Sequence, residues 1–156
     1  MMYRMLTMEE LKVFEEDFKQ FLIVNGVHTE EWEEMNLTNK EKAVQLVEVF
    51  SDSVLQKVYE KVLFLEHRSK NSCLVFKIKK ENIELISINT KEGSNLSLET
   101  PESIHSAFID NIKELSVFKT EKAFEKNREL EVHKLLQQGC FQSSELFWES
   151  LTSIIK

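Results

Sequence analysis

Apolar residues recur every three or four positions along the first third of the chain, which is the period of an amphipathic helix. Thr7, followed three residues later by Glu10, forms a capping-box pattern. The first helix is therefore predicted over about 8–25, and Asn25-Gly26 is a typical helix end. A short acidic helix is predicted next, over Glu30–Met35.

The longest predicted helix runs from Lys40 to about Arg68, because this stretch contains neither Gly nor Pro. A second capping box, Thr38 with Glu41, marks its start. Hydroxyl and carboxylate side chains at 51–53 compete for backbone hydrogen bonds, so the pattern leaves open whether the helix is continuous there.

The hydrophobic period changes to two in the middle of the chain, where Leu74–Ile78 and Ile83–Ile88 alternate with polar or outward-facing positions. Lys80-Glu81-Asn82 suits a tight connection, so the two segments predict an antiparallel hairpin. An isolated hairpin is marginal in water. It must therefore lie on helices, gain a third strand or pair with another copy, and Leu115–Phe118 is the candidate third strand.

Three further helices are predicted in the chain after the hairpin. One opens at Thr100-Pro101, one runs from about Glu125 or Arg128 to Gln138, and one covers Glu145–Ile155. The order of helices, hairpin and helices predicts a mostly helical α+β fold in a single domain, residues 1–156, with a central antiparallel β-hairpin packed on helices.

The net charge of −7 is concentrated near the N-terminus, where residues 1–36 hold nine acids and three bases. An acidic surface repels phosphate backbones, so nucleic acid is not the expected partner. A solvated acidic helix face is the simplest interpretation of this pattern.

The two cysteines, Cys73 and Cys140, lie far apart and form no CxxC pair. The N-terminal residues include no apolar run of signal-peptide length, and no segment approaches the ~20 apolar residues of a membrane span. These features predict a cytoplasmic protein with reduced thiols and no membrane contact.

The segment LFLEHRSKNSCL at 63–74 places Glu66, His67, Arg68 and Cys73 close together in sequence. A catalytic site would need Cys73 within hydrogen-bond reach of a base such as His67. The favoured interpretation is structural, because cationic side chains suit the end of a helix and a small thiol suits the start of a strand. Glu66, His67 and Cys73 stay the weak catalytic candidates, and Arg68 a weak binding candidate.

No metal or cofactor site is predicted. The four histidines are scattered, and the glycine-rich motifs that bind phosphate or dinucleotides do not occur. Trp32 and Trp148 are instead candidates for partner contacts, because each falls beside the apolar stripe of its predicted helix.

Three stretches together, 3–11 (YRMLTMEEL), 50–54 (FSDSV) and 65–67 (LEH), resemble a family of small single-domain Bacteroidetes proteins of unknown function. The resemblance implies a cytosolic bacterial protein and brings no activity, ligand or catalytic residue. It makes Tyr3, Arg4 and Asp52 binding candidates, and an Arg4–Asp52 contact is one hypothesis.

Two functional hypotheses follow. The first is a non-catalytic protein–protein interaction module that uses the acidic N-terminal helices or an unpaired edge of the hairpin, including pairing with a second copy. The alternative is a small enzyme or ligand-binding domain, with its site where the long helix meets the hairpin.

Overall fold

The chain has an α+β fold with more helix than strand, as the hydrophobic pattern predicts. The computed structural model describes residues 1–155. The described chain divides into two units, which are taken separately below. Residues 1–60 contain helices only and are called the helical unit. Residues 61–156 contain all five strands and are called the sheet unit.

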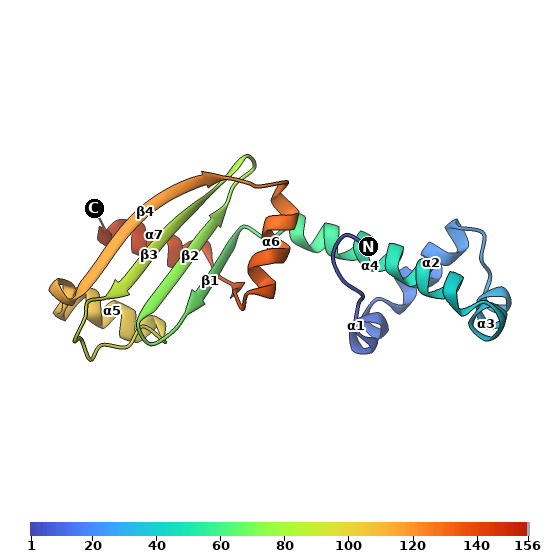
Figure 1. Ribbon diagram of the computed structural model, residues 1–156, viewed down its shortest axis with the longest axis horizontal. Helices are drawn as coiled ribbons and strands as arrows, with labels where there is room; N and C mark the ends of the chain where they lie inside the picture. The colour runs from blue at the N-terminus through green and yellow to red at the C-terminus, as the bar shows by residue number, and fades with distance from the viewer. Residues whose placement is uncertain (156) are drawn as a thin grey trace. The chain divides into compact units, whose positions relative to one another are not determined.

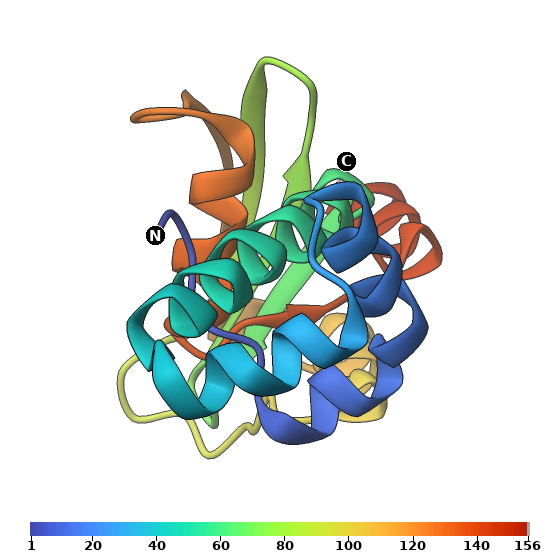
Figure 2. The same ribbon diagram turned by 90° about the vertical axis from the view of Figure 1, so that its right-hand side faces the viewer.

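Four helices form the helical unit (Figure 2): α1 (Met8–Val13), α2 (Glu15–Val24), α3 (Thr29–Thr38) and α4 (Lys40–Glu60). The predicted capping box is confirmed, because the Thr7 hydroxyl accepts from the Glu10 amide at 3.1 Å and the Glu10 carboxylate accepts from the Thr7 amide at 2.8 Å. The predicted helix over 8–25 is interrupted at Phe14. Gly26, with φ of +76°, follows the end of α2, where a left-handed residue is favoured.

α4 begins at Lys40 as predicted, but the predicted capping residue, Thr38, is wrong. Thr38 is the last residue of α3, and its hydroxyl donates to the Glu34 carbonyl at 2.9 Å. Asn39 takes the capping role, accepting from the Lys42 amide at 3.3 Å. The helix then continues without interruption through residues 51–53, where the Ser51 hydroxyl bonds to the Leu6 amide at 3.0 Å.

The predicted end of the long helix is also wrong, because α4 stops at Glu60 and β1 (Phe64–Arg68) follows. A short apolar run such as Val62–Leu65 fits a buried strand as well as a helix, and periodicity does not separate the two. Residues 64–68 form a strand because β1 lies between two other strands, β2 and β5, and hydrogen-bonds to both.

The five strands form one antiparallel sheet in the order β4-β3-β2-β1-β5 (Figure 1). The predicted hairpin is confirmed as β2 (Ser72–Ile78) and β3 (Asn82–Thr90), and the predicted third strand is confirmed and extends further, as β4 (Leu115–Ala123). The two-residue strand β5 (Phe141–Gln142) was not predicted. It lies between Gly139, whose φ is +101°, and the last helix.

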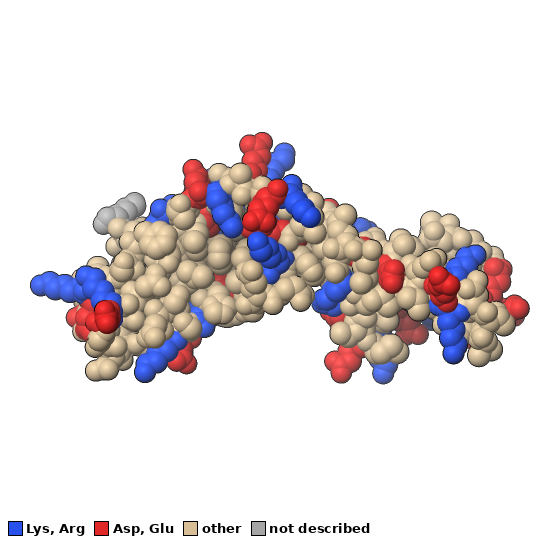
Figure 3. All heavy atoms as spheres, in the orientation of Figure 1, with Lys and Arg blue, Asp and Glu red and all other residues tan. Residues whose placement is uncertain are grey.

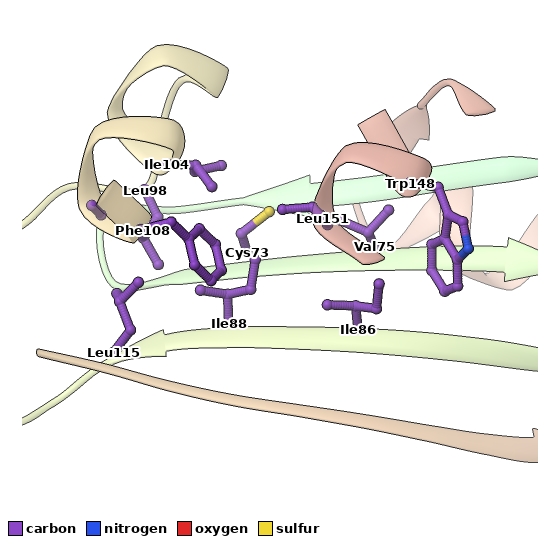
Figure 4. Packing of buried hydrophobic residues seen from close by; sticks show 11 residues of the cluster. Cys73, Val75, Ile86, Ile88, Leu98, Ile104, Phe108, Leu115, Trp148 and Leu151 are labelled. Carbon is purple, nitrogen blue, oxygen red and sulfur yellow. The ribbon is translucent and has the colours of Figure 1, made fainter. Parts of the chain in front are cut away.

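Helices cover both faces of the sheet. α5 (Pro101–Asp110) and α7 (Glu145–Ile155) pack on one face over a cluster of buried apolar side chains (Figure 4). α6 (Arg128–Gln137) lies on the other, where Glu131 pairs with Lys122 of β4 at 3.1 Å. Thr100 caps α5 through the Ser103 amide at 3.1 Å, with Pro101 in the first turn as predicted.

Candidate functional site

The weak catalytic candidates lie on β1 and β2, where the strand register separates them. Cys73 is paired with Arg68, whereas His67 is paired with Leu74. Directly opposed residues share a face of a sheet, and neighbouring residues along a strand point to opposite faces. Cys73 therefore shares a face with Glu66 and Arg68, and His67 points to the other face. The structure forms no His67–Cys73 pair of nucleophile and base.

Cys73 is buried in the core of the sheet unit. Its exposed fraction is 0%, and its sulfur points into the space between α5 and α7, near Leu151 (Figure 4). Burial, with a smaller contribution from the charge of Glu66, raises the pKa of the Cys73 thiol to about 12. A reactive cysteine needs a lowered pKa and access to solvent. Cys73 has neither, and its environment is that of a small apolar core residue.

The buried Glu66 forms an ion pair with the partly buried Arg68 on the same face. Arg68 Nε lies 2.8 Å from Glu66 Oε2, although the two groups are not aligned as a hydrogen bond. The Arg68 guanidinium also donates to the Glu99 carbonyl at 3.3 Å and lies 5.1 Å from the centre of the Phe141 ring. These contacts connect β1 to β5 and to the loop before α5. They give Arg68 a structural role.

His67 is partly exposed on the opposite face, next to Gly139. A side-chain carbon added at Gly139 would lie 3.6 Å from the imidazole ring, so the ring packs directly over this turn. A hollow of about 260 Å³ is lined by residues 61–64 and 142–145. It includes neither His67 nor Glu66 nor Cys73.

The N-terminal segment binds to α4 through Asp52. The carboxylate of Asp52 accepts from the backbone amides of Met2 at 2.7 Å and Tyr3 at 2.9 Å. The Tyr3 hydroxyl bonds to Gln56, and its ring packs edge-on against Tyr59 with centroids 5.0 Å apart. Asp52 and Tyr3 therefore hold the chain start in place within the helical unit.

The hypothesis of an Arg4–Asp52 contact is wrong. Arg4 forms a two-pronged hydrogen bond with Glu10 instead, at 2.8 and 3.0 Å. This bond, together with the Thr7 amide, lowers the pKa of Glu10 to about 2. The capping box of α1 is thus tied to the segment that precedes it.

The two tryptophans differ in exposure. Trp148 is 2% exposed in the core of the sheet unit, so its predicted place at a surface is wrong. The α7 stripe is wider than sequence spacing indicated, and it includes this ring. Trp32 is partly exposed in the helical unit and meets Phe18 edge-on, with ring centroids 5.2 Å apart.

Trp32 lines a groove between α2 and α3 with a volume of about 350 Å³. The apolar lining is formed by five side chains, namely Phe18, Leu22, Ile23, Val27 and Trp32. Polar residues of α2 complete it, including the exposed Glu15 and Glu16. Lys19 is paired with these two glutamates at 3.8 and 3.5 Å. The groove combines an apolar floor with an acidic edge.

The apolar pattern of the sequence does not predict the groove, because Ile23 and Val27 lie outside the apolar stripe of the helix predicted over 8–25. The one signal in the sequence for the groove is a large apolar residue, Ile23, that lies outside this stripe. Ile23 is 52% exposed, which is unusual for a side chain of this size.

The helical unit also carries the whole net charge. Residues 1–60 contain thirteen acids and six bases, a net charge of −7, whereas residues 61–156 contain fourteen of each. On the visible face of the sheet unit, blue and red side chains are interspersed (Figure 3). The acidic character of the chain is thus a property of the unit that carries the groove.

A protein-family model described as "Family of unknown function (DUF6495)" matches residues 1–156. The chain belongs to this family. The predicted resemblance to a family of unknown function is confirmed over the full length, and the DUF6495 match includes both units. No curated protein and no solved structure matches the chain.

Membership of the DUF6495 family assigns no ligand. Within residues 1–155, no three His, Cys, Asp or Glu side chains gather in a way that suits a metal ion. Across the same residues, every helix is too short or too polar to cross a bilayer.

Proposed function

We propose that this chain is a non-catalytic protein–protein interaction module whose groove between α2 and α3 binds a basic amphipathic segment of a partner protein. The observation that supports this proposal is that apolar side chains and the acidic Glu15 and Glu16 line the same groove. An amphipathic helix binds such a groove by inserting apolar residues spaced three or four apart.

The size of the groove supports a side-chain anchor site. About 350 Å³ is at the small end of small-molecule sites, and it suits one or two large apolar side chains. The floor is already formed, since Leu22 and Val27 are 5% and 8% exposed. Ile23 at its side is open and would lose water-exposed area when a partner binds.

The charge of the helical unit supports a basic partner. Glu15 and Glu16 lie at the groove, and four exposed glutamates of α3 flank Trp32 in sequence: Glu30, Glu31, Glu33 and Glu34. Complementary charge raises association rates and suppresses unsuitable partners. A lysine-rich face beside the inserted apolar residues would meet this surface favourably.

The cellular setting that we propose is the bacterial cytoplasm. Cys73 and Cys140 are both buried and unpaired, as expected of thiols in a reducing compartment.

The proposal is tested by titrating the full chain with a synthetic amphipathic helix of leucine and lysine and with its leucine–glutamate counterpart. Isothermal titration calorimetry should show binding of the basic peptide only. Ile23→Ser should weaken it about tenfold, because about 1.4 kcal/mol of apolar contact is lost.

Val24→Ser is the matched control. Val24 is the next residue of the same helix, is 84% exposed and does not line the groove, so its substitution should leave affinity unchanged. Equal affinity for the two peptides, or equal effects of the two substitutions, would contradict the proposal.

A further inference from the structure

Strand β4 forms an open edge of the sheet. In the described part of the chain it pairs with β3 on one side, and no strand lies beyond it on the other (Figure 1). Ser116 and all residues from Phe118 to Ala123 are exposed. The strand is nine residues long and contains neither proline nor glycine. An edge of this kind is a template for another strand.

The charge pattern of β4 is complementary to itself. The sequence Lys119-Thr120-Glu121 reads cation, neutral, anion, so an antiparallel copy centred on Thr120 places each lysine opposite a glutamate. A pair centred on Lys119 would oppose two lysines, and one centred on Glu121 would oppose two glutamates. Opposite charges stabilise a cross-strand pair and like charges destabilise it.

We propose that two copies of this chain associate by antiparallel pairing of β4 with β4, around a two-fold axis at Thr120. This inference is independent of the groove in the helical unit. Residues 117–123 overlap in this register, and the two five-stranded sheets become one.

The other side chains of β4 fit the same register. Phe118, which is 52% exposed, lies opposite Lys122 of the second copy, whose aliphatic stem can cover the ring. Val117 lies opposite Ala123, and both are small enough to avoid a clash. The sheet unit carries no net charge, so the net charge of this unit does not oppose pairing of the two edges.

Charged residues on an edge strand can also serve to prevent pairing. Charges that repel in every register serve this role most fully. The charges of β4 do not repel in every register, because Glu121 lies between Lys119 and Lys122. The register centred on Thr120 is therefore favoured. The pattern therefore selects a partner strand instead of excluding all of them.

A cysteine at the axis gives the most direct test. In Thr120→Cys the two new thiols face each other across the axis, with Cα atoms about 4.5–5.5 Å apart, which is within disulfide range. Ser116→Cys is the control, because the two Ser116 positions lie about 27 Å apart along the paired strands. Mild oxidation of the full chain should give covalent dimers of Thr120→Cys and not of Ser116→Cys.

Charge exchange tests the register in solution. Lys119→Glu and Glu121→Lys should each raise the dimer dissociation constant about tenfold or more in sedimentation, and the double exchange should restore it. Lys70→Glu, in the exposed turn between β1 and β2, should have no effect. A chain that stays monomeric at millimolar concentration overturns the proposal, as does equal crosslinking of both cysteine variants or a double exchange that restores nothing.

Discussion

The helical unit and the sheet unit bury their apolar side chains to different extents. Ten large apolar residues of the helical unit are exposed among 60 residues, against six among the 95 described residues of the sheet unit. The sheet unit instead holds a cluster of eleven side chains, each at most 6% exposed. The unit with more exposed apolar surface is also the one with the net charge. We infer that the sheet unit stabilises the fold and the helical unit presents a surface for binding.

The largest expected difference concerns chemical reactivity inside the sheet unit. With Cys140→Ala leaving Cys73 as the single thiol, alkylation by iodoacetamide at pH 8 should be at least about a hundredfold slower than in urea-unfolded protein. The reason is the burial of Cys73 and its pKa of about 12. The rate is followed by mass spectrometry. Fast alkylation that His67→Ala abolishes would restore the catalytic interpretation of this segment.

The next effect is on stability. Leu151→Ala leaves a cavity in the sheet-unit core and should lower the free energy of unfolding by about 2–5 kcal/mol. Val24→Ala, at an exposed site of the helical unit, should change it by less than about 0.5 kcal/mol. Urea denaturation followed by tryptophan fluorescence, with Trp32 in the helical unit and Trp148 in the sheet unit, measures both. Similar losses of unfolding free energy in Leu151→Ala and Val24→Ala would contradict the inference that the sheet unit stabilises the fold.

Within the helical unit, the N-terminal segment offers a smaller effect. Asp52→Ala removes the acceptor for the Met2 and Tyr3 amides and should destabilise the chain by about 1–2 kcal/mol. Ser53→Ala, at the exposed neighbouring position on α4, is the control and should be near neutral. Urea unfolding by circular dichroism compares them. A loss no larger than that of the control would mean that Asp52 does not hold the segment.

The smallest effect depends on pH. Glu10 has a pKa of about 2 in the folded chain, below its unfolded value of about 4.3, so its contribution is present at neutral pH and is lost as pH falls from about 5 to 2. Glu10→Gln should therefore cost about 1 kcal/mol at pH 7 and almost nothing near pH 2. Glu9→Gln is the exposed control. A loss that does not change with pH would show that the carboxylate charge is not what matters.

Local patterns predicted the elements whose signals lie in adjacent residues. The capping box at Thr7, the hairpin over Leu74–Ile88 and the strand from Leu115 all follow from spacing within a few positions. Long-range pairing was not predictable in this way. The pattern predicts helix for the residues of β1, because their strand structure depends on pairing with β2 and β5. β5 is not predicted because two residues are too few to show a hydrophobic period.

The positions of the candidate site residues also depend on long-range pairing that local patterns do not predict. Sequence proximity grouped His67 with Cys73, but the pleat of β1 and β2 places them on opposite faces. Asp52 and Arg4 were predicted to contact each other, and each instead binds a different partner within the helical unit. The acidic charge at the N-terminus was visible in the sequence, and the groove beside it required the packing of α2 on α3.

The central claim, that the helical unit is the binding surface, is tested most directly by residue-resolved NMR. In a titration of the isotope-labelled full chain with the leucine–lysine peptide, the amides of α2 and α3 and the Trp32 indole should shift, with the Trp148 indole unchanged. Shifts concentrated in the sheet unit, or no shift at Trp32 when the peptide binds, would contradict the account.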